Sequence, residues 1–243
     1  MSSLILIHGG VHGSWCWAPM IAPLRAAGCH VQAVDLPGRD GTAAGGSTVT
    51  FADWVATVSA AVDASPSPPF LVAHSMGGLS ASQVAERRPG DLAGVVYVSA
   101  VVPANGGNGL TELQGAGPDC ALLDEGAMVF SEDGSTVSVT PAAARLAFYG
   151  RCPEPAVVDA LGRLCAESVA PMATPLSLGA GFAAVPKIYL GCTDDRAATP
   201  AFQRLQAQRC GAEFRVIESD HSPFFSAPDT LLAMLLDATD VRR

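Results

Sequence analysis

Ser75 lies in the run Ala73-His74-Ser75-Met76-Gly77, where an apolar stretch ends and a segment with a helical pattern begins. A serine hydroxyl is a weak nucleophile unless a tight turn exposes it to a base and to amide donors. The small residues Ala73 and Gly77 would let the backbone bend that sharply. Alanine replaces the first glycine of the G-x-S-x-G pattern, so an ordinary serine on a buried connection is the alternative. We interpret the run as a nucleophile elbow.

A base and an acid for this serine are available later in the chain. His221 directly follows the last expected strand, and Asp194 and Asp195 follow the strand before it. We assign Asp195 as the acid, which would fix the tautomer of His221 and stabilise the imidazolium formed when it takes the proton of Ser75. Asp194 is the alternative acid. Asp220 fits less well, because adjacent residues rarely point at each other.

The run HGGVHG (residues 8–13) follows the first expected strand. A glycine-rich turn in this place leaves backbone N–H groups free to face a developing oxyanion. We predict that the backbone amides of Gly10 and Met76 are the two donors.

The remaining histidines receive simpler interpretations. We expect His12 to line the substrate pocket, His8 to hydrogen-bond its own loop and His74 to pack beside the elbow. Because carboxylates at metal-ligand spacing are lacking, we predict no metal, and the expected chemistry needs no cofactor.

Alternating strand and helix patterns must position these residues. Short runs rich in β-branched or large apolar residues predict buried strands at residues 4–7, 31–34, 70–73, 95–99, 187–190 and 214–217. Helical patterns separate them at residues 17–27, 51–64, 76–88, 200–209 and 228–238. This alternation predicts a mainly parallel sheet with helices on both faces. Each candidate catalytic residue directly follows a strand, so all would gather at one edge of the sheet.

The alternation breaks between residues 103 and 186, which predicts an inserted cap at residues 103–185 and an α/β core made of residues 1–102 and 186–243. Within the cap, residues 128–130 and 136–139 predict a hairpin, and residues 141–149 and 155–166 predict helices. Phe148 is our best candidate for a pocket contact. Phe130, Tyr149, Phe182, Met128 and Met172 are further candidates, although each alone is better explained by docking of the cap onto the sheet.

Composition narrows the class of protein. The chain has 243 residues, 49% of them hydrophobic, and a formal net charge of −9 with scattered basic residues, which argues against a nucleic-acid partner. No charge precedes Arg25, and the apolar residues 4–7 are too few for a signal peptide. The apolar stretch 92–104 is interrupted and shorter than the roughly 20 residues that span a bilayer. We therefore expect a cytoplasmic monomer or homodimer with no membrane partner.

Several motifs together carry a resemblance to a known family. The segments LILIHGGVHGSW (residues 4–15), AVDLPG (33–38) and AHSMGG (73–78) resemble the α/β-hydrolase superfamily, whose catalytic residues follow the order serine, acid, histidine. The segment CTDD (192–195) and the pair Asp220-His221 are similar to the branch of plant methylesterases, salicylate-binding esterases and hydroxynitrile lyases and their bacterial relatives. The resemblance is weakest at residues 103–178.

The resemblance also implies site residues and an α/β-hydrolase fold with a cap. In that branch, the acid is the aspartate two positions after the threonine, here Asp195, and the residue after the HG pair, here Gly10, supplies an oxyanion amide. Hydroxynitrile lyases of the branch have a lysine after the catalytic histidine and a threonine after the first strand's histidine. This chain has Ser222 and Gly9 at those positions, which favours ester hydrolysis.

We therefore expect a serine esterase that cleaves a small or medium carboxylic ester through an acyl-enzyme on Ser75. One alternative is a lyase or eliminase that uses the same site as a general base and forms no adduct. Another is a binding protein for small ligands with an inactive site, against which the complete set of candidate catalytic residues argues.

Overall fold

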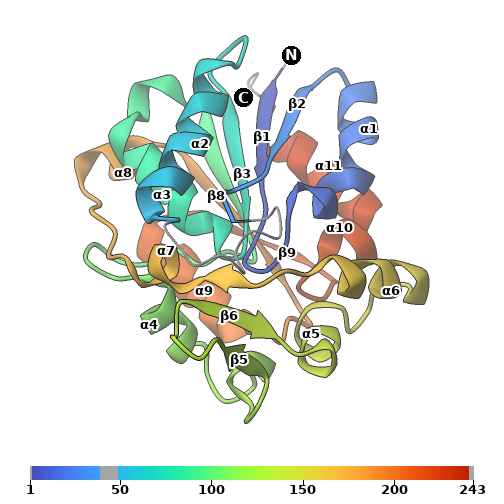
Figure 1. Cartoon of the computed structure of the whole chain (residues 1–243). Helices are drawn as coiled ribbons and strands as arrows, with labels where there is room; N and C mark the ends of the chain where they lie inside the picture. The colour runs from blue at the N-terminus through green and yellow to red at the C-terminus, as the bar shows by residue number, and fades with distance from the viewer. Residues whose placement is uncertain (1, 39–48, 241–243) are drawn as a thin grey trace.

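The computed structural model describes residues 2–38 and 49–240 and contains a six-stranded sheet at its centre (Figure 1). The strands lie in the order β2-β1-β3-β4-β8-β9, and every neighbouring pair is parallel. Their bounds are β1 (Ser3–Ile7), β2 (His30–Val34), β3 (Phe70–His74), β4 (Gly94–Val98), β8 (Lys187–Cys192) and β9 (Glu213–Ile217). The predicted parallel sheet is confirmed. Strand order reverses at β1, between β2 and β3, and ligands of open α/β sheets bind beyond the carboxyl ends of the strands at such a point.

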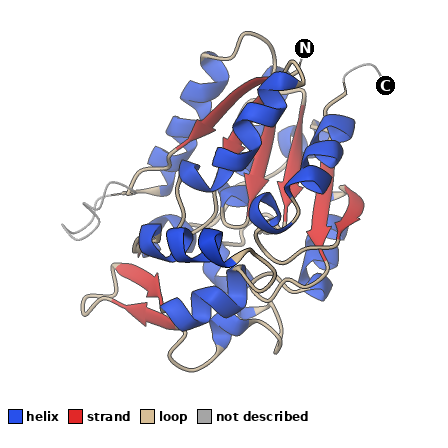
Figure 2. Ribbon diagram, turned by 90° about the vertical axis from the view of Figure 1, so that its right-hand side faces the viewer, coloured by secondary structure: helices blue, strands red, loops and turns tan. Residues whose placement is uncertain are grey.

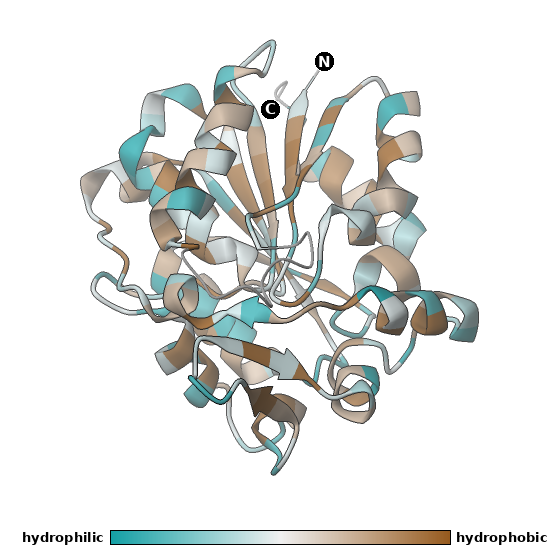
Figure 3. Ribbon diagram, viewed as in Figure 1, coloured by the Kyte–Doolittle hydropathy of each residue, from teal (hydrophilic) through white to brown (hydrophobic). Residues whose placement is uncertain are grey.

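Both faces of the sheet are buried, which explains why its strands are hydrophobic along most of their length (Figure 3). In β1, Leu4 and Leu6 join the apolar cluster on the face covered by α1 and α11. Ile5 and Ile7 join the cluster on the opposite face, which α2, α3 and α9 cover. These helices, seen on either side of the sheet in Figure 2, are α1 (Ala18–Ala26), α2 (Phe51–Asp63), α3 (Gly77–Arg87), α9 (Pro200–Cys210) and α11 (Pro228–Ala238). They confirm the helices predicted from the sequence.

Local chemistry sets the helix ends. Thr50 accepts a hydrogen bond from the backbone N–H of Asp53 at 3.3 Å, and the Asp53 carboxylate accepts one from the Thr50 N–H at 2.8 Å. This reciprocal capping begins α2. Helix α9 begins at Pro200 after the capping residue Thr199 and ends before Gly211, whose φ of 67° terminates the helix.

The residues between β4 and β8 form a second, three-stranded sheet, in the order β5-β6-β7, with antiparallel neighbours. Its strands are β5 (Met128–Phe130), β6 (Thr136–Val139) and β7 (Glu167–Ser168), and nearby helices are α4 (Gly109–Gln114), α5 (Pro141–Phe148), α6 (Glu154–Arg163) and α7 (Val169–Ala173). The predicted hairpin is confirmed, whereas β7 was not predicted from the sequence. Strands β5 and β6 lie beyond the carboxyl ends of the main sheet, at the bottom of Figure 1.

The end of this insertion does not lie over the strand ends. Helix α8 (Ala180–Ala184) packs beside α3, where the Glu86 carboxylate accepts hydrogen bonds from the backbone N–H groups of Gly179 and Phe182, each at 2.7 Å (Figure 1). These hydrogen bonds lower the pKa of Glu86. The assignment of all of residues 103–185 to one cap stays an interpretation. Within residues 2–38 and 49–240, no helix has both the length and the apolar character to cross a bilayer.

Candidate active site

Ser75 stands on a strained turn between β3 and α3. Its φ is 50°, in the left-handed region that serine rarely adopts. The turn is held by hydrogen bonds from the Ser75 N–H to the Val98 carbonyl at 3.2 Å and from the Val101 N–H to the Ser75 carbonyl at 2.9 Å. A Cβ on Gly77 would lie 2.5 Å from the His8 carbonyl oxygen. Glycine at that position is therefore required by the close approach of the first loop.

His221 and Asp195 form a buried pair. The imidazole Nδ1 lies 2.7 Å from Asp195 Oδ2, and both residues are at most 2% exposed. The other carboxylate oxygen accepts hydrogen bonds from the backbone N–H groups of Ala197 and Ala198, each at 2.8 Å. The Gln203 amide donates to Oδ2 at 3.0 Å. Asp195 is therefore held in place to accept from His221, which selects the tautomer that carries its proton on Nδ1.

The other two candidate acids have different partners. The exposed Asp194 accepts a hydrogen bond from Thr193 and pairs with Arg151 at 2.6 Å, and both interactions lower the pKa of its carboxyl. Asp220 accepts from the backbone N–H groups of Arg151 and Ser222, at 2.7 and 3.0 Å. Asp195 is thus the acid that the structure places against the imidazole.

His74 connects the elbow to the loop of His221. Its Nε2 lies 2.8 Å from the His221 carbonyl oxygen, and the two imidazole rings are 4.6 Å apart. Because a carbonyl only accepts, Nε2 carries the proton. Burial, followed by the nearby histidines His221 and His12, lowers the pKa of His74 well below its ordinary value. His74 is therefore neutral near pH 7 and packs beside the elbow, as predicted.

The glycine loop (residues 8–13) lies against the elbow. A Cβ on Gly9 would lie 2.7 Å from Ser75 Cβ, and one on Gly10 would lie 3.4 Å from Met76 Cγ. In the part of the chain that the structure describes, no acceptor is found for the N–H of Gly10 or Met76. Val11 has a φ of 56°, a conformation that costs a β-branched residue about 1–3 kcal/mol.

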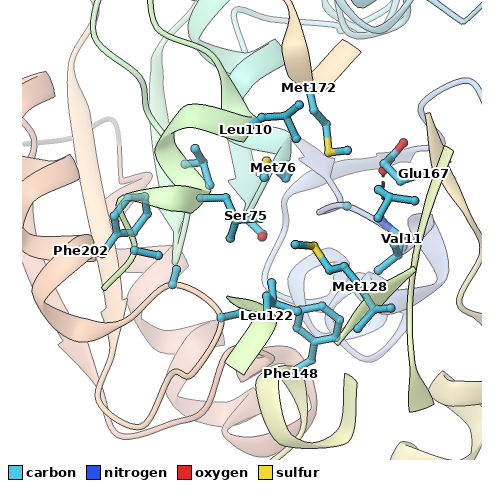
Figure 4. A pocket seen from close by; sticks show the side chains of 18 of the residues that line it. Val11, Ser75, Met76, Leu110, Leu122, Met128, Phe148, Glu167, Met172 and Phe202 are labelled. Atoms are coloured by element: carbon cyan, nitrogen blue, oxygen red, sulfur yellow. Dashed lines mark hydrogen bonds between the residues drawn. The ribbon is translucent and has the colours of Figure 1, made fainter. Parts of the chain in front are cut away.

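A pocket opens in front of Ser75 (Figure 4). Core residues such as Met76, Val101 and Phe202 line it together with residues of the insertion such as Leu110, Met128 and Phe148. Of the described residues that line this pocket, Ser75 and Glu167 are those with hydrogen-bonding side chains. The pocket suits an apolar ligand that presents a polar group to Ser75.

The structure places the other candidate pocket residues in different surroundings. Phe148, Phe130, Met128 and Met172 line the pocket, whereas Phe182 packs near α3 instead.

The role of His12 as a substrate contact stays a prediction. Its ring is 5.2 Å from that of Phe148, and its nitrogens are 2.8 Å from the Gly10 carbonyl oxygen and 2.7 Å from the Tyr149 hydroxyl, so it supports the glycine loop. His12 does not line the pocket in front of Ser75 but lines a second one, together with Trp15, Asp35 and Arg163. Because the Gly10 carbonyl only accepts, Nδ1 of His12 carries its proton and Nε2 accepts from the Tyr149 hydroxyl. Burial raises the pKa of Tyr149, so this hydroxyl keeps the proton that it donates.

The roles of Gln203 and Glu167 were not predicted from the sequence. Gln203 is fully buried and joins Asp195 to the Cys192 N–H, which it accepts at 2.7 Å. Glu167, 1% exposed, accepts the Val11 N–H at 3.1 Å although 156 positions separate the two residues. No local sequence pattern predicts a contact between residues so far apart in the chain. Among the described residues, no three His, Cys, Asp or Glu side chains are grouped to hold a metal ion.

Comparison with known proteins agrees with this architecture. A family model described as "Alpha/beta hydrolase family" matches residues 4–234. The chain is 29% identical over 257 residues to Methylesterase 7 of Arabidopsis thaliana, covering 97% of this chain and 95% of that protein. It is 30% identical over 250 residues to Esterase PIR7B of Oryza sativa subsp. japonica, with 96% and 93% covered.

A solved structure of a pyrethroid hydrolase from Sphingobium faniae is also similar, with a TM-score of 0.87, 25% identity and coverage of 99% of this chain and 98% of that one. The parallel sheet and the family match over nearly the whole length lead to one conclusion. The chain belongs to the α/β hydrolase family.

Proposed function

We propose that the protein is a serine hydrolase that cleaves small or medium carboxylic esters through an acyl-enzyme on Ser75. The observation that carries this proposal is the buried His221–Asp195 pair at 2.7 Å, at the same sheet edge as a serine held on a strained elbow. The esterase and methylesterase relatives support ester hydrolysis. The apolar pocket supports an ester with a hydrocarbon acyl or alcohol group.

Two acyl transfers make up the proposed reaction. Because Asp195 engages Nδ1 of His221, Nε2 is the nitrogen that takes the Ser75 proton while Oγ forms a bond to the ester carbonyl carbon. The bond to the alkoxy oxygen then breaks, and the alcohol leaves with the proton from His221. Water then attacks the acyl-enzyme while His221 takes one of its protons. The bond from the acyl carbon to Ser75 Oγ breaks, His221 passes that proton to Oγ, and the carboxylic acid leaves with the other proton of the water.

Negative charge on the substrate oxygen rises in both steps. The N–H groups of Gly10 and Met76 would donate to that oxygen, and loss of one such donor typically lowers the rate by about 10²–10³. Asp195 would stabilise the imidazolium that exists at the same moment.

The test combines active-site labelling with turnover of p-nitrophenyl esters. Wild-type protein is expected to gain the mass of one fluorophosphonate adduct on Ser75. Ser75→Ala and His221→Ala are expected to lower kcat by at least about 10³-fold, and Asp195→Asn by roughly 10⁴-fold.

Asp194→Asn is the matched control, because this neighbouring acid is exposed and paired with Arg151. It should retain kcat within about twofold. Turnover that survives Ser75→Ala, or wild-type protein that resists labelling, would contradict the acyl-enzyme and favour a lyase that uses the site as a general base. Ligand binding without any turnover would point to a binding protein instead.

A further inference from the structure

The peptide that joins Gly10 to Val11 is held at both ends by side chains. Its N–H donates to Glu167 Oε2 at 3.1 Å (Figure 4). Its carbonyl oxygen lies 2.8 Å from His12 Nδ1. The next carbonyl, that of Val11, accepts the backbone N–H of Cys165 at 3.0 Å. Two of these three contacts come from the segment 165–167, which belongs to the insertion and ends in β7.

The conformation of Val11 explains why such contacts are needed. Its φ of 56° is in the left-handed region, which is least favourable for β-branched residues. Strain of this kind persists only where the surrounding structure enforces it. Here Glu167 and Cys165 hold both backbone groups of Val11, so they oppose relaxation of the glycine loop.

Gly10 lies directly beside these contacts. A Cβ on Gly10 would lie 3.7 Å from Glu167 Oε2 on one side and 3.4 Å from Met76 Cγ on the other. A rotation of the Gly10–Val11 peptide would shift Gly10 and redirect its N–H. A small misplacement of such a donor removes its benefit in the transition state.

We propose that Glu167 is a positioning residue, whose carboxylate holds the strained Gly10–Val11 peptide so that the Gly10 N–H faces the developing oxyanion. This inference rests on the proposed function, because it takes Gly10 as an oxyanion donor. The insertion would then support catalysis through the glycine loop, in addition to lining the pocket.

The experiment measures kcat, KM and inhibition by an alkylboronic acid, which forms a tetrahedral adduct on an active serine. Glu167→Ala should lower kcat by about 10–10²-fold and weaken the boronate by a similar factor, with KM changed less than about threefold. Glu167→Gln keeps an oxygen that can accept the Val11 N–H, so it should retain kcat within about fivefold. Ser168→Ala, its neighbour in β7, is the control for disturbance of the strand.

A rescue variant keeps the proposal testable if Glu167→Ala is poorly folded. Glycine adopts positive φ without strain, so Val11→Gly added to Glu167→Ala should restore kcat at least about fivefold. Val11→Ala also removes the side chain but keeps a Cβ, and it should rescue much less.

Three outcomes would overturn the inference: unchanged kcat in Glu167→Ala, equal loss in Glu167→Gln and Glu167→Ala, or equal rescue by alanine and glycine at position 11. Equal loss in the first two variants would show that the charge of Glu167 acts on the substrate. Labelling of Ser75 in the wild type separates these outcomes from a failure of the proposed hydrolysis, which would abolish labelling as well.

Discussion

At the scale of residues, backbone strain is concentrated at the carboxyl edge of the sheet. Among the described residues, the non-glycine residues with positive φ are Val11, Ser75 and Ser99. They follow β1, β3 and β4 respectively, which are adjacent in the sheet. Such strain commonly marks functional sites, where packing and hydrogen bonds elsewhere offset its cost. The clustering thus agrees with the position of the candidate active site.

His74 gives a prediction about pH at this scale. Its pKa is lowered in the folded protein, whereas in the unfolded chain it is about 6.5. Below pH 6.5 the unfolded chain therefore binds a proton that the folded protein does not. The free energy of unfolding should fall as the pH decreases from about 6.5, by up to about 1.4 kcal/mol per pH unit from this one group.

His74→Gln should remove this contribution, since glutamine does not titrate but can still donate to the His221 carbonyl. Urea unfolding between pH 7.5 and 5 would measure it. Below pH 6.5, the free energy of unfolding of the variant should fall less steeply with decreasing pH than that of the wild type. The difference in slope should be up to about 1.4 kcal/mol per pH unit, which corresponds to one proton. Equal slopes in the two proteins would show that His74 does not titrate in this way.

At the scale of elements, α9 holds the acid loop through its first turn. Gln203 accepts the Cys192 N–H at the end of β8 and donates to Asp195 in the loop that follows. One buried amide thus fixes the distance between a strand, a loop and a helix. The same helix covers the sheet with Phe202 and Ala207.

Gln203→Leu, a substitution of similar size, should therefore affect both stability and turnover. It leaves the Cys192 N–H buried without its acceptor, which costs about 1–3 kcal/mol. It also removes a donor to Asp195, so kcat should fall more than KM rises. Gln208→Leu is the matched control, because Gln208 is exposed on the same helix and its loss should change stability by less than about 0.5 kcal/mol. Equal effects of the two substitutions would contradict a special role for Gln203.

At the scale of the whole molecule, both the core with the main sheet and the insertion with the small sheet contribute residues to the lining of the pocket. Strand β5 contributes Met128 and Phe130 to the lining of the pocket, although Phe130 is half exposed, and Val129 between them does not line it. The hairpin therefore sets the far wall of a pocket whose reactive end belongs to the main sheet. Changes in β5 should alter substrate length preference without altering the chemistry.

Met128→Ala tests this division. In the wild type, kcat/KM for p-nitrophenyl esters should rise about three- to fourfold per added methylene until the pocket is full, given about 0.8 kcal/mol per buried methylene. Met128→Ala should move the optimum to longer acyl chains and leave fluorophosphonate labelling intact. The control Val129→Ala should leave the optimal acyl-chain length unchanged. If Met128→Ala also leaves it unchanged, the acyl group does not bind against Met128.

Local sequence patterns were enough to predict the layered fold and the residues that follow its strands at the carboxyl edge. The spacing of apolar residues that is typical of a strand or a helix is a local property of the sequence. It recurs in most of these elements, so they could be predicted from the sequence. Because parallel strands share one carboxyl edge, the positions of Ser75, Asp195 and His221 after strands predicted that they would gather there. The structure places His221 against Asp195 at that edge.

How the insertion contacts the core follows from three-dimensional packing and could not be predicted from local patterns. Three contacts depend on how distant segments fit together: that of Glu167 with Val11, that of the His12 ring with Phe148 and that of the Phe182 N–H with Glu86 of α3. Such contacts depend on side-chain volume and hydrogen-bond geometry in three dimensions, and they leave no periodic trace in the residues around them. The residues that shape the pocket in front of Ser75 and support the glycine loop could therefore not be predicted from sequence patterns.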